Sequence, residues 1–98
     1  MDKMKVVIIT GAGRGLGESV AIDLLSKGMC VVIADVHKVD IKKYNNNSEF
    51  ISSDNIMSHQ VDVSNRVEVK EMFASAFERF KQIDYLINFA GINRDAPF

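Results

Sequence analysis

The feature that most constrains this chain is an apolar run, "MKVVIIT" at residues 4–10, that leads directly into "GAGRGLG" at residues 11–17. A continuous run of β-branched residues is typical of a parallel strand covered by helices on both faces. Glycine directly after such a strand permits a tight turn with positive φ. The stretch therefore predicts a buried strand, a glycine loop (residues 11–17) and the start of a helix.

A second strand follows after a helical pattern. "MCVVIAD" at residues 29–35 is another buried apolar run, and Gly28 stands where a helix would end. A helix between two parallel strands makes a right-handed crossover the expected connection. The apolar residues at helical spacing before Gly28 are Leu16, Val20, Ala21, Leu24 and Leu25.

Further along the chain the pattern repeats more weakly. Between residues 36 and 55 only a short helical hint at residues 40–44 precedes the polar loop "NNNS". "IMSHQVDV" at residues 56–63 predicts a third strand, Ser64 is placed to cap a helix, and residues 85–89 predict a fourth strand. The apolar stripe expected on that helix consists of Val69, Met72, Phe73, Ala76, Phe77 and Phe80.

These elements predict one domain over residues 1–98 with an α/β fold, a Rossmann-like α/β/α half-domain of three layers. The parallel sheet is expected in the order 3-2-1-4, because the connection from the third strand to the fourth must pass the first strand. Such an order places a topological switch point between strands one and four, where ligands bind in this fold class.

Composition narrows the possible partners and the compartment. A formal net charge of -1 gives no electrostatic reason to expect nucleic acid or an anionic membrane as a partner. No apolar run approaches the roughly 20 residues of a membrane span, and the first run stops at Thr10, too early for a signal peptide. The lone cysteine, Cys30, lies in a predicted buried strand and suits a reducing compartment, so we expect a cytoplasmic protein.

The spacing of the glycines distinguishes between dinucleotide fingerprints. A G-x-G-x-x-G pattern would need glycine where Leu16 or Glu18 stands. Gly11, Gly15 and Gly17 instead fit T-G-x-x-x-G-x-G, and the chain resembles the N-terminal half of a short-chain dehydrogenase/reductase. A diphosphate could approach backbone amides and the positive end of the helix here, although a tight turn without a ligand would need the same glycines.

Two acidic residues, Asp35 and Asp62, are also consistent with dinucleotide binding. Asp35 ends the second strand about 20 residues after the glycines, where a carboxylate can accept hydrogen bonds from an adenosine ribose. It could equally be an aspartate of a surface turn. "VDVS" at residues 61–64 resembles the family segment in which the carboxylate, here Asp62, and the next backbone amide, here of Val63, hold the adenine. Alternatively, Asp62 belongs to the start of the helix at Ser64.

"NFAG" at residues 88–91 resembles the N-N-A-G motif of the family, with Phe89 in place of the second asparagine. The resemblance implies that Asn88 steadies the sheet. It also implies that the backbone at Ala90 and Gly91, where small residues are required, passes beside the cofactor. The end of the sequence, "AGINRDAPF", is especially similar to 3-oxoacyl-acyl-carrier-protein reductases.

The cofactor expected from this reading is NAD(H), with NADP(H) second. The diphosphate would lie on the glycine loop, and Asp35 would repel a 2′-phosphate on the ribose. Arg14 favours NADP(H) instead, because the resemblance implies that a basic residue at this position favours NADP in related enzymes. The loop residues expected to contact the cofactor are Gly11, Gly13, Arg14, Gly15, Leu16 and Gly17.

No catalytic residue is expected in this chain. The resemblance implies hydride transfer with a serine and a Y-x-x-x-K pair, but Tyr44 and Tyr85, the only tyrosines, are followed four residues later by Ser48 and Phe89. The two histidines lack the spacing of metal ligands, so no metal is expected.

Two functions follow from this. The chain is expected to be the NAD(P)-binding portion of an oxidoreductase, or else a non-catalytic association module. Because the fourth strand would leave a bare sheet edge, we expect either a homo-oligomer or a missing C-terminal half to cover it.

Overall fold

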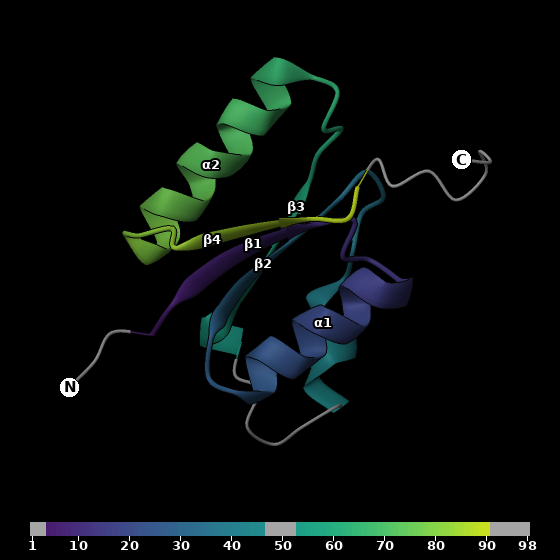
Figure 1. Cartoon of the computed structure of the whole chain (residues 1–98), viewed down its shortest axis with the longest axis vertical. Coiled ribbons are helices and arrows are strands. Elements are labelled where there is room, and N and C mark those ends of the chain that lie inside the picture. The colour runs from purple at the N-terminus through teal and green to yellow at the C-terminus, as the bar shows by residue number, and fades with distance from the viewer. Residues whose placement is uncertain (1–3, 47–52, 91–98) are drawn as a thin grey trace.

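The computed structural model describes residues 4–46 and 53–90, which form a parallel sheet between helices. The sheet order is β3-β2-β1-β4, and each strand pair is parallel (Figure 1). The predicted α/β fold and its 3-2-1-4 order are thereby confirmed. The strands are β1 (Val6–Thr10), β2 (Cys30–Asp35), β3 (Ile56–Gln60) and β4 (Tyr85–Asn88).

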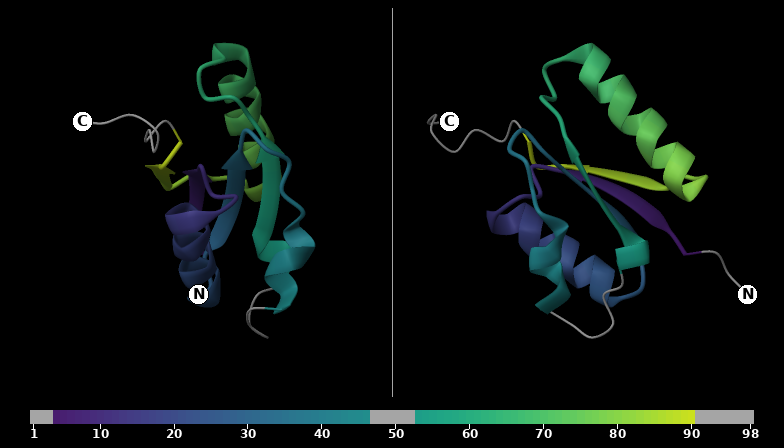
Figure 2. Two further views of the ribbon diagram at one scale, coloured as in Figure 1. Left: turned by 90° about the vertical axis from the view of Figure 1, so that its right-hand side faces the viewer. Right: turned by 180° about the vertical axis from the view of Figure 1, so that it is seen from behind.

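Helices cover both faces of the sheet (Figure 2). On one face lie α1 (Gly15–Ser26) and the 3-10 helix η1 (Ile41–Asn46), and on the other lies α2 (Arg66–Phe80). A shorter 3-10 helix, η2 (Ser53–Asn55), leads into β3. The three layers agree with the predicted half-domain, and η1 accounts for the helical hint at residues 40–44.

The core consists of two clusters divided by the sheet. Successive strand residues point to opposite faces, so Ile9 and Ile33 pack toward α1 while Ile8 and Val32 pack toward α2. All of these side chains are fully buried, which explains why β1 and β2 are continuously apolar rather than alternating. Cys30 is buried as predicted, and burial raises the pKa of its thiol despite the opposing charge of Arg79.

The start of α2 differs from the prediction. Asn65, not Ser64, is the N-cap: its Oδ1 accepts hydrogen bonds from the backbone N–H of Val67 at 3.0 Å and of Glu68 at 3.2 Å. The Ser64 hydroxyl instead donates to the Asp62 carboxylate at 2.6 Å. Both residue types cap helices well, so the sequence alone does not distinguish them.

Two apolar residues that were assigned to helix cores are exposed. Phe77 of α2 is 54% exposed and Leu16 of α1 is 67% exposed, because each lies at the edge of its apolar stripe and not at its centre. The third strand is also shorter than predicted, since it ends at Gln60 rather than at residue 63. The fourth strand ends one residue early, at Asn88.

The edge formed by β4 is partly exposed. Among the described residues this strand pairs only with β1, and its Tyr85 and Leu86 are about half exposed. Whether a second copy or another segment covers this edge stays a prediction. Among residues 4–46 and 53–90, the helices are too short or too polar to cross a membrane.

Candidate functional site

Close packing explains two glycines of the glycine loop. Gly11 has φ +70°, and a Cβ atom placed on it would lie 2.7 Å from the backbone nitrogen of Ala90. A Cβ on Gly17 would lie 2.2 Å from the carbonyl oxygen of Gly11. Any side chain at either position would therefore push the start of α1 away from the ends of β1 and β4. These two glycines serve the fold whether or not a ligand is bound.

Gly15 differs from them in what lies around it. Its φ of +64° favours glycine, but a Cβ on it would meet no atom within 4 Å. The space in front of the first residue of α1 is therefore open. The positive end of the helix and its first backbone N–H groups face solvent or a ligand there.

This open space belongs to a cavity of about 650 Å³ at the carboxyl ends of the strands. Its volume lies within the range of small-molecule and cofactor sites. The segments that follow β1, β2, β3 and β4 all contribute to its lining. It brings together most of the predicted site residues, namely Gly11, Arg14, Gly15, Leu16, Gly17, Asp35, Asp62, Val63 and Ala90.

Two predicted residues that the structure describes do not line this cavity, and a third lies outside the described residues. Gly13 lines an adjoining cavity of about 460 Å³, together with Arg14 and Asp35. Asn88 accepts a short hydrogen bond from the buried Thr10 hydroxyl, so its side chain joins β4 to β1. Gly91 falls outside the described residues.

Asp35 joins the two cavities and organises the turn after β2. One carboxylate oxygen accepts a hydrogen bond from the Gly13 N–H and the other from the His37 N–H, both at 2.9 Å. A carboxylate oxygen has two lone pairs, so each can still accept a hydrogen bond from a ligand hydroxyl. Asp35 can therefore stabilise the turn and accept a hydrogen bond from a ligand at the same time.

Asp62 likewise makes local hydrogen bonds and lines the larger cavity. Its carboxylate accepts hydrogen bonds from the Ser64 N–H at 2.9 Å and the Ser64 hydroxyl at 2.6 Å. These bonds lower the pKa of the carboxyl group, which stays ionised at neutral pH. Its own N–H donates to Glu68 at 2.9 Å. Asp62 is thus hydrogen-bonded at the start of α2, which was the alternative interpretation of this residue. It also lines the larger cavity.

Five residues that line the larger cavity were not predicted from the sequence. Four of them directly follow a strand end or a predicted site residue, and His37 lies two residues after the end of β2. Exposed apolar side chains gather here, with Leu16, Val36 and Val63 each more than one third exposed. Such a lining suits a flat apolar ring with a few polar anchors. The missed residues are Val36, His37, Val61, Ser64 and Phe89.

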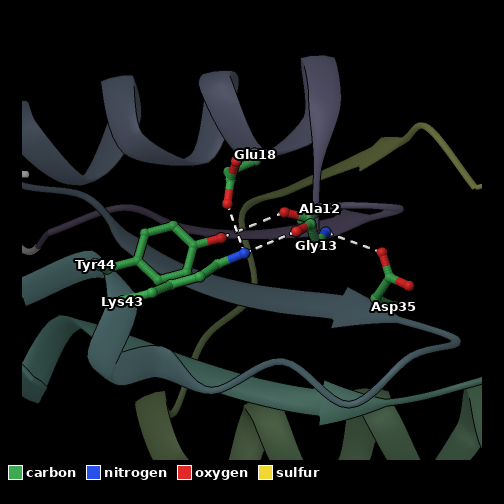
Figure 3. A network of polar contacts seen from close by, with 6 residues as sticks. All are labelled: Ala12, Gly13, Glu18, Asp35, Lys43 and Tyr44. Atoms are coloured by element: carbon green, nitrogen blue, oxygen red, sulfur yellow. Dashed lines mark hydrogen bonds and ion pairs between the residues drawn. The ribbon is translucent and has the colours of Figure 1, made fainter.

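A buried tyrosine supports the glycine loop from η1. The Tyr44 side chain is fully buried, and its hydroxyl donates to the Ala12 carbonyl at 3.3 Å (Figure 3). Burial, and then the negative charges of Glu18 and Asp35, raise the pKa of Tyr44 to about 12. The phenol is therefore neutral and engaged with the backbone throughout the physiological range.

We expect stability to fall at alkaline pH because of Tyr44. Its pKa is higher in the folded state than the ordinary value of 10.0, so the folded protein holds this proton more tightly than the unfolded chain does. The stabilisation, about 2 to 3 kcal/mol, is complete below pH 10 and is lost as the pH rises toward 12. Urea unfolding across this range measures it. Tyr44→Phe should flatten the dependence, Tyr85→Phe should not, and equal slopes in both variants would contradict the assignment.

Comparison with known proteins identifies the family. The family model described as short chain dehydrogenase matches residues 5–98. The chain belongs to this family. The matched residues include the glycine loop, Asp35 and the segment after β4, and the cavity lies among them.

Individual relatives agree with the family assignment. Meso-2,3-butanediol dehydrogenase of Serratia marcescens is 37% identical over 89 residues, covering 91% of this chain and 34% of that protein. A 3-ketoacyl-(acyl-carrier-protein) reductase from Brucella melitensis, solved with NADH, is 30% identical with a TM-score of 0.67, covering 84% of this chain and 32% of that one. The structure of ElxO with NADPH bound is 30% identical with a TM-score of 0.73, and the match covers 98% of this chain and 38% of that one.

These relatives are much longer than the chain. It spans 25% to 36% of the length of the curated relatives that it matches. The matched part is the part that carries the glycine loop and the strands β1 to β4.

Proposed function

We propose that this chain is the NAD(H)-binding portion of a short-chain dehydrogenase oxidoreductase. The observation that carries the proposal is the convergence of four strand ends and the N-terminus of α1 on one cavity. Solved relatives hold NADH or NADPH. The open space in front of Gly15 also fits a ligand that approaches the backbone closely.

The glycine loop is the proposed diphosphate site. Backbone N–H groups at the start of α1 and the positive helix end favour an anion there. Arg14 and Leu16 are both exposed and line the cavity, so their backbone is accessible to a bound group. Gly13 would act indirectly, through its hydrogen bond to Asp35.

The adenosine half of the cofactor is assigned to the ends of β2 and β3. Asp35 would accept hydrogen bonds from the ribose hydroxyls, with its free lone pairs directed by the bonds from Gly13 and His37. Asp62 and the Val63 amide would hold the adenine, against the apolar lining. Ala90 would let the backbone after β4 pass beside the cofactor, while Asn88 would hold the sheet through Thr10.

We favour NAD over NADP as the physiological cofactor. An ionised carboxylate at the ribose repels a 2′-phosphate, and Asp35 has no cation bonded to it among the described contacts that could offset this repulsion. Arg14 lies beside it in the second cavity and opposes this preference. The carboxylate would contact the ribose directly, so we assign it the larger effect.

Bound nicotinamide would supply hydride chemistry, and this chain would supply binding and orientation. Tyr44 is unsuited to proton transfer because it is buried and its hydroxyl is bonded to Ala12. Hydride transfer by these 98 residues alone is therefore not expected. A 3-oxoacyl thioester is the substrate class that we propose for the whole enzyme, given the resemblance of the sequence after Ala90 and the Brucella relative.

Titration of NADH fluorescence tests the proposed function. The folded protein should enhance and shift the emission saturably, and NAD+ should compete. Absence of saturable binding in a sample whose circular dichroism shows a folded α/β protein would contradict the proposal. Sedimentation in the same buffers, with and without NADH, measures whether the chain associates, as the exposed edge of β4 predicts.

A further inference from the structure

Two neighbouring side chains of η1 donate hydrogen bonds to the backbone of the glycine loop (Figure 3). The Tyr44 hydroxyl donates to the Ala12 carbonyl at 3.3 Å, and the Lys43 ammonium donates to the Gly13 carbonyl at 2.8 Å. Two successive peptide planes of the loop are therefore fixed by one short helix that follows β2. Local loop geometry alone does not require either contact.

The orientation of these planes follows from the trans peptide bond, in which the N–H points opposite to the C=O. In the first plane, the Ala12 carbonyl points to Tyr44 and the Gly13 N–H points to Asp35 at 2.9 Å. In the second, the Gly13 carbonyl points to Lys43, so the Arg14 N–H is turned to the opposite side of the loop. Lys43 thereby determines which side of the loop presents that amide.

Lys43 also changes the charge at the start of α1. Its ammonium lies 2.5 Å from the carboxylate of Glu18, which stands in the first turn of the helix. A carboxylate there opposes a phosphate at the same helix end. Both side chains are more than half buried, at 40% and 32% exposure, so water screens the pair incompletely. The ion pair therefore neutralises a charge that would weaken anion binding.

We propose that Lys43 is a positioning residue for the dinucleotide: it orients the Gly13–Arg14 peptide and cancels the charge of Glu18, with Tyr44 fixing the preceding peptide. The proposal rests on the proposed cofactor function. Lys43 does not line the larger cavity, and its ammonium contacts Gly13 and Glu18, so we assign it a role through the loop and not through direct contact with the cofactor.

Replacing Lys43 with methionine tests the proposal by NADH titration. We expect Lys43→Met to raise the Kd for NADH roughly three- to tenfold, since it removes a charged hydrogen-bond donor from a partly buried site. Lys42→Met is the matched control, because it removes the same charge from the adjacent exposed residue of η1. Lys43→Arg should restore most of the affinity. Equal affinity of the Lys43→Met variant and the Lys42→Met control would overturn the proposal.

A double variant separates the two effects of Lys43. Adding Glu18→Gln to Lys43→Met removes the unpaired carboxylate but leaves the Gly13 carbonyl without its donor. Affinity should recover only in part. Complete recovery would mean that Lys43 acts through charge alone, and would overturn its role in orienting the peptide.

Amide hydrogen exchange, measured without cofactor, tests the role of Lys43 independently of whether the protein binds NADH. Amides of residues 11–18 should exchange faster in Lys43→Met and in Tyr44→Phe than in Lys42→Met. Tyr44→Phe keeps the buried ring, so it serves as a second variant if Lys43→Met folds poorly. Unchanged exchange in both would overturn the inference. Absence of NADH binding by the unaltered protein would overturn the proposed function, while the exchange data would still decide whether η1 holds the loop.

Discussion

Replacing Gly15 with valine should abolish NADH binding, with a loss of affinity of at least about 100-fold. Its Cβ and two methyl groups would occupy the open space in front of the first turn of α1, where we place the diphosphate. Valine also disfavours the φ of +64°, so the first turn would shift and its amides would no longer converge. Fluorescence titration measures the affinity, and circular dichroism establishes that the variant is folded.

Gly28→Val is the matched control for that experiment. Gly28 has φ +89° and equally open surroundings, but it follows the other end of α1. Both substitutions should cost similar stability, about 1 to 2 kcal/mol, because both force a side chain into the left-handed region. Only Gly15→Val should lose NADH. Loss of binding in both variants, or in neither, would refute the assignment of the loop.

Removing the carboxylate of Asp35 should shift cofactor preference toward NADP(H). We expect the ratio of the two dissociation constants to change on the order of 100-fold, because repulsion of the 2′-phosphate disappears while Arg14 remains. Asp35→Ala also leaves the Gly13 and His37 amides without an acceptor. Asp35→Asn keeps one acceptor oxygen and so isolates the effect of charge. Parallel titrations with NADH and NADPH measure the ratio.

The control for this prediction is Asp23→Asn, which removes the same charge from an exposed residue of α1 that pairs with Lys27. It should leave the cofactor ratio unchanged. If the Asp35 variants keep the original preference, the ribose assignment is wrong. If the Asp23 variant changes it equally, the effect reflects net charge rather than a contact.

The parts of the site that the sequence predicted are those encoded by local patterns. Gly11 and Gly17 were recognisable by their positions after an apolar strand, and the structure gives the reason: a Cβ would lie 2.7 Å from a backbone nitrogen at one and 2.2 Å from a backbone oxygen at the other. Asp35 was recognisable because it ends an unbroken apolar strand. Exposed apolar lining residues such as Val36 carried no comparable signal, since an apolar residue after a strand can equally enter the core.

Local sequence patterns sufficed to predict the two central strands, the sheet order and the position of the glycine loop. Continuous β-branched runs are typical of parallel strands buried between helix layers, and crossover rules leave few orders for a four-stranded parallel sheet. Only the tertiary structure decided that Asn65 rather than Ser64 caps α2, that Phe77 lies outside the core, and that Lys43 reaches Gly13 from 30 residues away. Those outcomes depend on how η1 and α2 pack on opposite faces of the sheet, and no local pattern of residues encodes a contact of that range.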